Sequence, residues 1–455
     1  MKRLEIWTIS ALFAAMITIP VVIFAAGVRP EPNQNRPPTP LPELSVSGVL
    51  GRDLTPQLDA YLEDAVIIAP GAAAAQAWTD VALGDSPSPK VTLGQNGWLY
   101  YTLSLNKPCI APAEADDFVD RIARAQRIVN ATGRSLVVAI APDKATIIPE
   151  FLPEDDDSCV AEVAQVLSEL DEPQALLTIW DEMRRARAND RPIYFRLDTH
   201  WTHAGAAVMA EAIVETLAPG GWDPAAVRQV ATVDHEGDLT VLLGLPSTEP
   251  TDELATVLTG TEQSEAVRAL FTATGAEYEG ARAVDFSTTG KPIVAGHTLV
   301  LHDSFGWSLT PMLSPYFESV AFIRDNDPGT IALHDDVVAA STIVDVVVQR
   351  SIQEVFFDKD LAAGFLSALA DEFDSFAEGT KGNGDSLQLP PATTPDNDIY
   401  VIVELMAGND GAEVVYGDFT AALSPDSPRS AFYVGEGGKM SFAGQVHYRL
   451  VSISH

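Results

Sequence analysis

Two short segments about one hundred residues apart carry the side chains that could do chemistry. The first holds Asp198 and His200, separated by one residue, and the second holds Ser304. A serine hydroxyl is a weak nucleophile until a neighbouring base takes its proton. An imidazole can be that base, and a carboxylate can fix its tautomer and stabilise the imidazolium. If the two segments meet, they predict a Ser-His-Asp triad that forms an acyl-enzyme.

The elements around these residues must bring the two segments together. In an extended stretch, residues i and i+2 point the same way, so we expect Asp198 and His200 on one side. Open α/β sheets bind their ligands at the carboxyl ends of the strands. Backbone N–H groups beside Ser304, at the start of a helix, could stabilise an oxyanion. The flanking elements are strand-like runs at 193–197 and 298–301 and predicted helices at 203–217 and 307–317.

The same residues allow other interpretations. Asp198, His200, His203 and His302 could supply a zinc or iron site, with His-x-x-His spacing at the start of a helix. A serine that follows a strand is often only a helix N-cap. An Asp-x-His pair is often only a surface hydrogen bond. The residues alone therefore leave a triad, a metal site and a structural role as alternatives.

The rest of the central chain alternates between helical and strand-like runs. The segment 115–131 places Phe118, Ile122, Ala125 and Val129 on one helical face. This alternation predicts an α/β fold with a mostly parallel sheet covered by helices. The further predicted elements are a helix at 160–170 and strands at 136–140, 176–180, 320–323 and 344–348.

The two ends of the chain differ from this central part. An apolar run from Ile6 to Gly27 follows two basic residues, which predicts a transmembrane anchor or a signal peptide within residues 1–28. The remaining chain would then be extracytoplasmic. The predicted order continues with a Pro-rich linker (29–44), the main domain (45–377), a second linker (378–398) and a small β module (399–455) with strands at 400–405, 413–416, 431–434 and 445–453.

Composition excludes several classes of protein. The chain of 455 residues has 28 Lys and Arg against 64 Asp and Glu, so its formal net charge is −36. Such a chain repels phosphate backbones, which excludes a nucleic-acid binder. Two cysteines cannot build a four-cysteine zinc site. Outside the cytoplasm, Cys109 and Cys159 are expected to form one disulfide.

Five motifs in order carry a family resemblance. They are GQNGWLY (94–100), APDKATIIPEFLP (141–153), LDTHWTHAGA (197–206), GDLTVLLGLP (237–246) and VLHDSFG (300–306). Over about 45–357 the chain resembles the SGNH-hydrolase-like domain of the alginate O-acetyltransferase group of bacterial polysaccharide acetyltransferases. This resemblance implies an SGNH-like α/β/α sandwich with Ser304 as nucleophile, His200 as base and Asp198 as its orienter. His302 departs from the group, where glycine is common, and could narrow the pocket.

The resemblance also implies a function. We expect an O-acetyltransferase that acetylates a polysaccharide or cell-envelope glycan, receives acetyl from a membrane-bound O-acyltransferase-type partner, and needs no cofactor or metal. Lys144, Trp98, Trp201 and Trp307 are candidate substrate-binding residues. The alternatives are a carbohydrate esterase that uses the same triad and a non-catalytic glycan-binding protein.

Overall fold

The computed structural model divides the chain into two compact units. One contains residues 1–89 and 240–246, and the other contains residues 90–239 and 247–455. The first includes helix α4 (Pro70–Leu83), and the second includes all the candidate site residues described below. The structure describes residues 18, 22, 61, 70–105, 112–154, 175–189, 191–258, 284–287, 294–324, 333–358, 360–389, 397–417, 419–425, 428–434 and 437–454.

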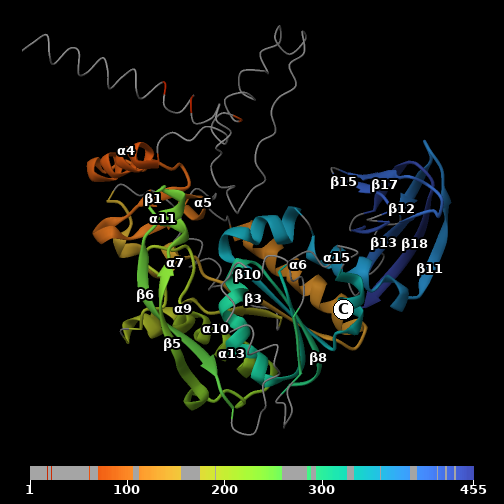
Figure 1. The fold of residues 1–455 in the computed structure, drawn as a ribbon. Helices are drawn as coiled ribbons and strands as arrows, with labels where there is room; N and C mark the ends of the chain where they lie inside the picture. Colours follow the sequence, from red (N-terminus) through yellow and green to blue (C-terminus); the bar gives the residue numbers. More distant parts are fainter. Residues whose placement is uncertain are drawn as a thin grey trace, which may run out of the picture. The chain divides into compact units, whose positions relative to one another are not determined.

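A six-stranded sheet forms the centre of the second unit (Figure 1). Its strand order is β4-β3-β10-β8-β9-β7. Neighbouring strands run parallel except at the β7 edge, where β7 pairs antiparallel with β9. The predicted α/β fold with a mostly parallel sheet is confirmed. The strands are β3 (Ser135–Ala141), β4 (Leu176–Thr178), β7 (Val284–Ser287), β8 (Val294–His302), β9 (Phe317–Ile323) and β10 (Thr342–Val348).

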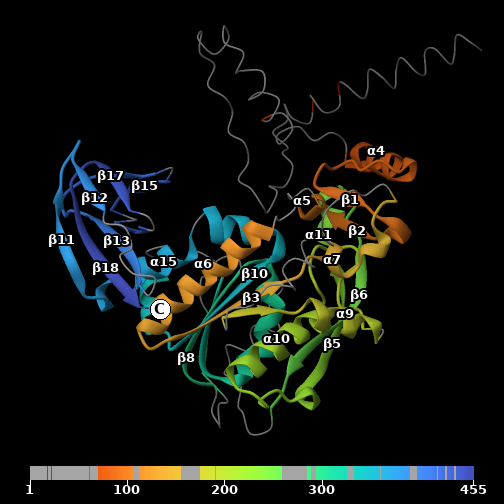
Figure 2. The same cartoon turned by 180° about the vertical axis from the view of Figure 1, so that it is seen from behind.

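Helices cover both faces of this sheet (Figures 1 and 2). Helices α6 (Pro112–Ala131) and α15 (Leu361–Ala368) lie along one face, and α10 (His203–Leu217) lies along the other. The apolar face predicted for α6 is buried. Helix α10 spans the predicted residues and begins at Thr202, whose hydroxyl accepts a hydrogen bond from the Gly205 N–H. Further helices are α5 (Thr102–Leu105), α7 (Lys144–Ile147), α9 (Trp180–Ala188) and α14 (His334–Ala339).

Two predictions beside the site were wrong. Segment 193–197 is no strand of the sheet, because it folds back on itself: the Phe195 N–H bonds the His200 carbonyl, and Tyr194 bridges Trp201. Segment 307–317 is no single helix, because Pro311 and Pro315 lack an amide N–H and interrupt it. It forms three short turns instead, namely η5 (Ser304–Leu309), α13 (Thr310–Leu313) and η6 (Ser314–Tyr316).

The C-terminal residues form two four-stranded antiparallel sheets, ordered β11-β18-β13-β16 and β12-β17-β14-β15. The segment 378–398, predicted as a linker, contains part of β11 and all of β12. Both lie at sheet edges, where alternating exposed positions give a polar sequence that resembles a linker. The strands are β11 (Ser375–Lys381), β12 (Ser386–Leu389), β13 (Asn397–Leu405), β14 (Ala412–Tyr416), β15 (Phe419–Leu423), β16 (Arg429–Tyr433), β17 (Gly438–Ala443) and β18 (Val446–Ser454).

Strand β13 joins this C-terminal module to the main core. Tyr400 and Ile402 belong to the hydrophobic cluster of the parallel sheet, whereas Val401 and Val403 belong to the cluster between the two antiparallel sheets. Because side chains alternate along a strand, one strand contributes to two cores.

Several predictions concern residues outside the described part of the chain. The apolar run 6–27 lies outside it except for Thr18 and Val22, and the Pro-rich segment 29–44, Cys109, Cys159 and the helix predicted at 160–170 also lie outside it. Among the helices of the described residues, none has the length and apolar character needed to cross a membrane.

Candidate active site

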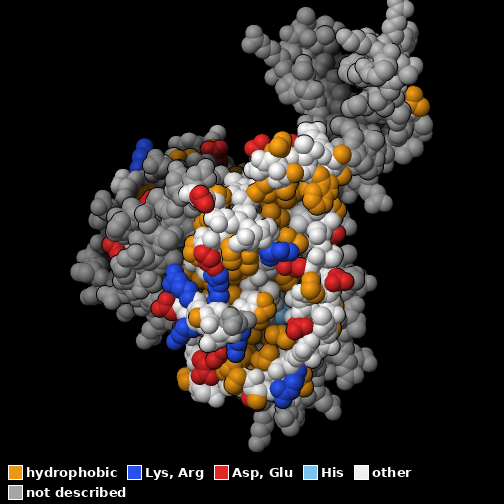
Figure 3. Space-filling model, turned by 90° about the vertical axis from the view of Figure 1, so that its left-hand side faces the viewer, with side chains coloured by type: hydrophobic (Ala, Val, Ile, Leu, Met, Phe, Trp, Pro, Cys, Tyr) orange, Lys and Arg blue, Asp and Glu red, His pale blue; other side chains and the backbone are white. Residues whose placement is uncertain are grey.

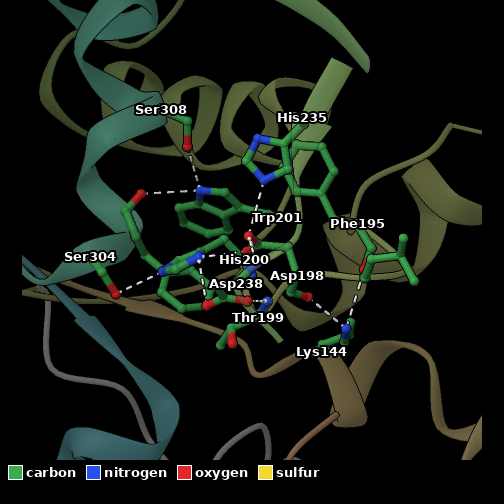
Figure 4. A network of polar contacts seen from close by, with 12 residues as sticks. Lys144, Phe195, Asp198, Thr199, His200, Trp201, His235, Asp238, Ser304 and Ser308 are labelled. Atoms are coloured by element: carbon green, nitrogen blue, oxygen red, sulfur yellow. Dashed lines mark hydrogen bonds and ion pairs between the residues drawn. The ribbon is translucent and has the colours of Figure 1, made fainter. Parts of the chain in front are cut away.

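The structure brings Asp198, His200 and Ser304 together (Figure 4). His200 Nδ1 lies 2.8 Å from Asp198 Oδ1, and His200 Nε2 lies 2.8 Å from Ser304 Oγ. In the tautomer that satisfies both contacts, Nδ1–H donates to the carboxylate and the serine hydroxyl donates to Nε2. This is the arrangement in which an imidazole can take the serine proton as the hydroxyl attacks.

Ser304 is placed by the end of a central strand. Strand β8 ends at His302, and Ser304 is the first residue of the turn η5. Asp303 fixes the turn, because one carboxylate oxygen accepts from the Phe305 N–H at 2.8 Å and the other accepts from the Val348 N–H. The predicted position of Ser304, after a strand and at a helical turn, is therefore confirmed, although the turn is shorter than the predicted helix.

Asp198 is reached by a different route from the one its spacing predicted. Asp198 and His200 lie on a loop, and Asp198 Oδ1 also accepts the backbone N–H of His200 at 2.8 Å. The other oxygen, Oδ2, accepts from the Asp238 N–H and from His235 Nε2, both at 3.0 Å. Burial alone would raise the pKa of Asp198, but the hydrogen bonds from His200 and His235 hold this pKa well below its usual range.

Lys144 supports the loop from beneath and is not a surface group for substrate. Its side chain is buried, at 4% exposed, and Nζ donates to the carbonyls of Asp198 at 2.6 Å and Phe195 at 3.2 Å. Burial lowers the pKa of Lys144 to about 7, and the negative charge of Asp198 acts in the opposite direction. Its prediction as a substrate-binding residue is corrected: Lys144 holds in place the backbone that carries the triad.

The three candidate tryptophans have different surroundings. Trp201 is 1% exposed, and its indole N–H donates to the Phe305 carbonyl at 3.1 Å and to Ser308 Oγ at 2.7 Å, so it joins the two halves of the site and is too buried to bind substrate. Trp307 is partly buried and contacts the His302 ring edge-on. Trp98 is also partly buried and lines a pocket.

His302 and His203 are neutral packing residues here. His302 is buried, its Nδ1 donates to the Asp303 carbonyl at 2.6 Å, and burial lowers its pKa to about 4. His203 Nδ1 accepts from the Leu254 N–H at 2.8 Å, and burial lowers its pKa to about 4 as well. His302 therefore packs beneath the nucleophile turn and does not narrow a pocket.

The four-residue metal set considered from the sequence is not assembled. Among the described residues, the one cluster with metal-ligand geometry is Asp198, His200 and Asp238. It lacks His203 and His302. It consists of the two triad residues and the acid whose backbone N–H supports Asp198, so the hydrogen bonds between these groups already explain their proximity.

A pocket of about 400 Å³ lies beside the triad loop. Arg187, Arg191 and Arg196 line it together with Trp98 and Glu249. Within the described part of the chain, no residue accepts a hydrogen bond from the guanidinium of Arg191 or Arg196. Figure 3 shows this side of the molecule, where Lys and Arg side chains are interspersed among hydrophobic and acidic ones. Three arginines in one pocket contrast with the net charge of −36.

The comparisons with known proteins agree with the site. Residues 91–277 match the family described as "SGNH hydrolase-like domain, acetyltransferase AlgX". The resemblance inferred from the motifs is thereby confirmed, and the O-acetyltransferase class predicted from the sequence is that of the matched family. The matched residues include the Asp198–His200 loop and end before Ser304.

The relatives cover only part of the chain. The probable alginate O-acetylase AlgJ of Pseudomonas fluorescens is 26% identical over 204 residues, covering 41% of this chain and 52% of the relative. The protein of the same name from Pseudomonas aeruginosa is 29% identical over 216 residues, covering 42% and 54%. The chain thus spans about half the length of these relatives. The solved O-acetyltransferase domain of Pseudomonas putida AlgJ, at 18% identity, covers 58% of this chain and 92% of that domain with a TM-score of 0.37, which is too distant to add to the argument.

Sequence reasoning missed two residues of the site. His235 and Asp238 both contact the Asp198 carboxylate, yet they lie about forty residues downstream of it. The Gly-Asp pair at 237–238 belonged to a motif of the family resemblance, which was the one available signal. Gly237 is required there, because a Cβ at this position would overlap the carbonyl of Leu197.

Proposed function

We propose that this protein is an extracytoplasmic O-acetyltransferase that modifies a polysaccharide or cell-envelope glycan through an acyl-enzyme on Ser304. The observation that carries the proposal is the continuous hydrogen-bonded chain from Asp198 through His200 to Ser304. The matched family and the names of the relatives support the transferred group, which is acetyl.

In the first half-reaction, Ser304 Oγ attacks the carbonyl carbon of the acetyl donor while His200 Nε2 takes the hydroxyl proton. The resulting imidazolium is stabilised by the Asp198 carboxylate at 2.8 Å. The tetrahedral intermediate collapses when His200 returns the proton to the leaving group. In the second half-reaction, His200 takes a proton from a sugar hydroxyl, and the sugar oxygen attacks the acetyl-serine.

The oxyanion needs a hydrogen-bond donor near Ser304. The N–H groups of Phe305 and Gly306 are bonded to Asp303, at 2.8 and 3.1 Å, so they are occupied in this structure. No described residue accepts from the Ser304 N–H, which therefore supports it as the oxyanion donor. This narrows the expectation that several neighbouring N–H groups would serve.

The arginine-lined pocket suits the acceptor glycan. Arg196 stands two residues before Asp198, so one loop borders both the pocket and the triad. Trp98 offers a ring on which a sugar can stack, and the guanidinium groups of Arg191 and Arg196 have donors to spare. Trp98 thus keeps its assignment as a substrate-binding residue in this proposal, and Trp307 remains a candidate.

The proposed location and donor rest on the N-terminus. The apolar run 6–27 after Lys2 and Arg3 supports a single-pass anchor with the catalytic unit outside the cytoplasm. Acetyl-CoA is not available there, so an integral membrane acyltransferase is the proposed donor of the acetyl group.

The test is to trap the acyl-enzyme. The full chain is incubated with an activated acetyl ester, and the mass of the intact protein is measured alongside Ser304→Ala, His200→Ala and a control, Ser341→Ala, whose hydroxyl bonds His297 beside the opposite end of β8. We expect one acetyl adduct in the wild type and the control and none in the other two variants. An adduct that persists in Ser304→Ala contradicts the proposal. An adduct that water removes but no glycan accepts identifies an esterase instead.

A further inference from the structure

Asp198 is held by two histidines. His200 Nδ1 bonds one carboxylate oxygen at 2.8 Å, and His235 Nε2 bonds the other at 3.0 Å (Figure 4). A serine triad requires only the first of these contacts. The second lies on the side of the carboxylate away from Ser304 and has no place in the proton transfers proposed above.

His235 is held firmly in this position. It lies in β5 (Val227–Glu236), which pairs antiparallel with β6 (Thr248–Thr256). Its ring stacks on Phe195, with centroids 4.0 Å apart and planes 13° from parallel. Two residues on, the backbone of Gly237 packs against Leu197, and the Asp238 N–H bonds the same oxygen of Asp198. Ring and backbone therefore approach the triad loop together.

We propose that His235 is a positioning residue of the acyl-transfer site: it orients Asp198 toward His200, and the charge on its ring tunes how strongly Asp198 favours the protonated form of His200. The inference rests on the proposed function. It concerns a side chain that acts through Asp198 and does not touch substrate.

The charges that face His235 explain why its ring can carry a proton. Asp198 bonds it directly, Glu249 on β6 and Asp238 at the start of α11 (Asp238–Leu242) add negative potential, and His203 on α10 is the neighbouring histidine. Burial alone would lower the pKa of His235, but the hydrogen bond to Asp198 and the three carboxylates outweigh burial and raise this pKa.

The consequence for catalysis has a definite sign. When His235 is protonated, Asp198 shares its charge between two cations and stabilises a proton on His200 less. His200 is then more often unprotonated and available as a base. Removing His235 leaves the carboxylate to His200 alone, which favours the imidazolium and moves the acid limb of the pH–rate profile to higher pH.

The first experiment compares three variants of the full chain in hydrolysis of an activated acetyl ester. His235→Leu removes both donor and charge, and His235→Gln keeps an amide donor but cannot titrate. His447→Gln is the matched control, because both histidine side chains are 34% exposed and His447 lies in the C-terminal module. We expect His235→Leu to lower kcat about tenfold, with KM little changed and the acid limb at higher pH. His235→Gln should recover most of kcat, and the control should match the wild type.

Equal losses of kcat in His235→Leu and His235→Gln with an unmoved pH profile would overturn the proposal, because they would indicate a packing role alone. A second measurement needs no activity: NMR titration of the His235 ring in the wild type and in Asp198→Asn. We expect the pKa of His235 to fall in Asp198→Asn, and an unchanged titration would also overturn the coupling. If wild-type Ser304 forms no adduct, the proposed function fails while this titration still decides whether the two groups are coupled.

Discussion

The carboxyl edge of the parallel sheet and the C-terminal pair of sheets bury different kinds of side chain. At the first, the buried groups include Lys144, Asp198 and His302, each with hydrogen-bond partners. In the second, the cluster between the sheets is apolar throughout, from Leu389 to Leu450. Burying polar groups costs free energy unless each finds a partner. The contrast shows where the fold sustains that cost, and it is the edge that carries the triad.

The two regions also differ in how their parts depend on each other. At the site, two segments far apart in sequence meet through Trp201, whose indole N–H bonds the Phe305 carbonyl and Ser308. In the module, neighbouring strands pair along antiparallel ladders. We therefore expect substitutions at the site to alter the rate and substitutions in the module to alter stability.

The largest expected effect is at Asp198. Asp198→Asn keeps the shape of the side chain but withdraws the acceptor that fixes the His200 tautomer, so kcat should fall by about 10³–10⁴-fold. Steady-state hydrolysis of an activated acetyl ester measures the change. A loss below about tenfold would mean that the carboxylate is structural, and the contrast between the two regions would be lost.

A matched change in the module should act on stability alone. Val401 is fully buried between the antiparallel sheets, and Val401→Ala should lower the free energy of unfolding by about 1–3 kcal/mol through the lost burial and the cavity. Denaturant unfolding measures this, and kcat should stay within about twofold of the wild type. A large drop in kcat without unfolding would show that the module takes part in the reaction.

A smaller effect is expected in the arginine-lined pocket. Replacing Arg191 and Arg196 together by alanine removes two guanidinium groups that have no described partner, so the fold should tolerate the change. We expect KM for the glycan acceptor to rise by several-fold to about tenfold, as for the loss of one or two charge-assisted hydrogen bonds. Hydrolysis of the small ester should be unaffected. Equal changes for both substrates would place these arginines outside acceptor binding.

The smallest effect concerns pH and Lys144. Its pKa of about 7 in the folded chain lies below the ordinary value of 10.5, so between about pH 7 and 10 the unfolded chain binds more protons. The wild type should therefore gain stability relative to Lys144→Met as pH rises through this window, by at most about 1.4 kcal/mol per pH unit. Below pH 7 the slopes should coincide. Thermal unfolding of both proteins, with Lys439→Met as an exposed control, would show no divergence if Lys144 stays charged when folded.

Local patterns predicted much of this structure, and long-range contacts account for what they missed. The face of α6, the bounds of α10 and the strands β3, β8 and β10 follow from apolar periodicity. The triad was predictable because its two segments carry the right residue types. The burial of Lys144 was not, because the carbonyls that surround its Nζ belong to a loop about fifty residues away.

The same distinction explains the errors in the elements. Segment 193–197 is as apolar as a strand, but its hydrogen bonds go to residues 200–202, and no periodicity records that choice. His235 alternates with exposed neighbours in β5 and looks like an ordinary surface position until the fold places Asp198 beside it. Contacts of this kind are fixed by tertiary packing.

The nucleophile turn carries a constraint of its own. A Cβ on Gly306 would overlap the ring of His302, the last residue of β8. Positions 302 and 306 therefore form a single steric choice: a large side chain at the first requires none at the second. A designer who shortens residue 302 would free residue 306, and one who alters residue 306 alone would push the imidazole into Trp307 and Phe322, whose rings it contacts edge-on.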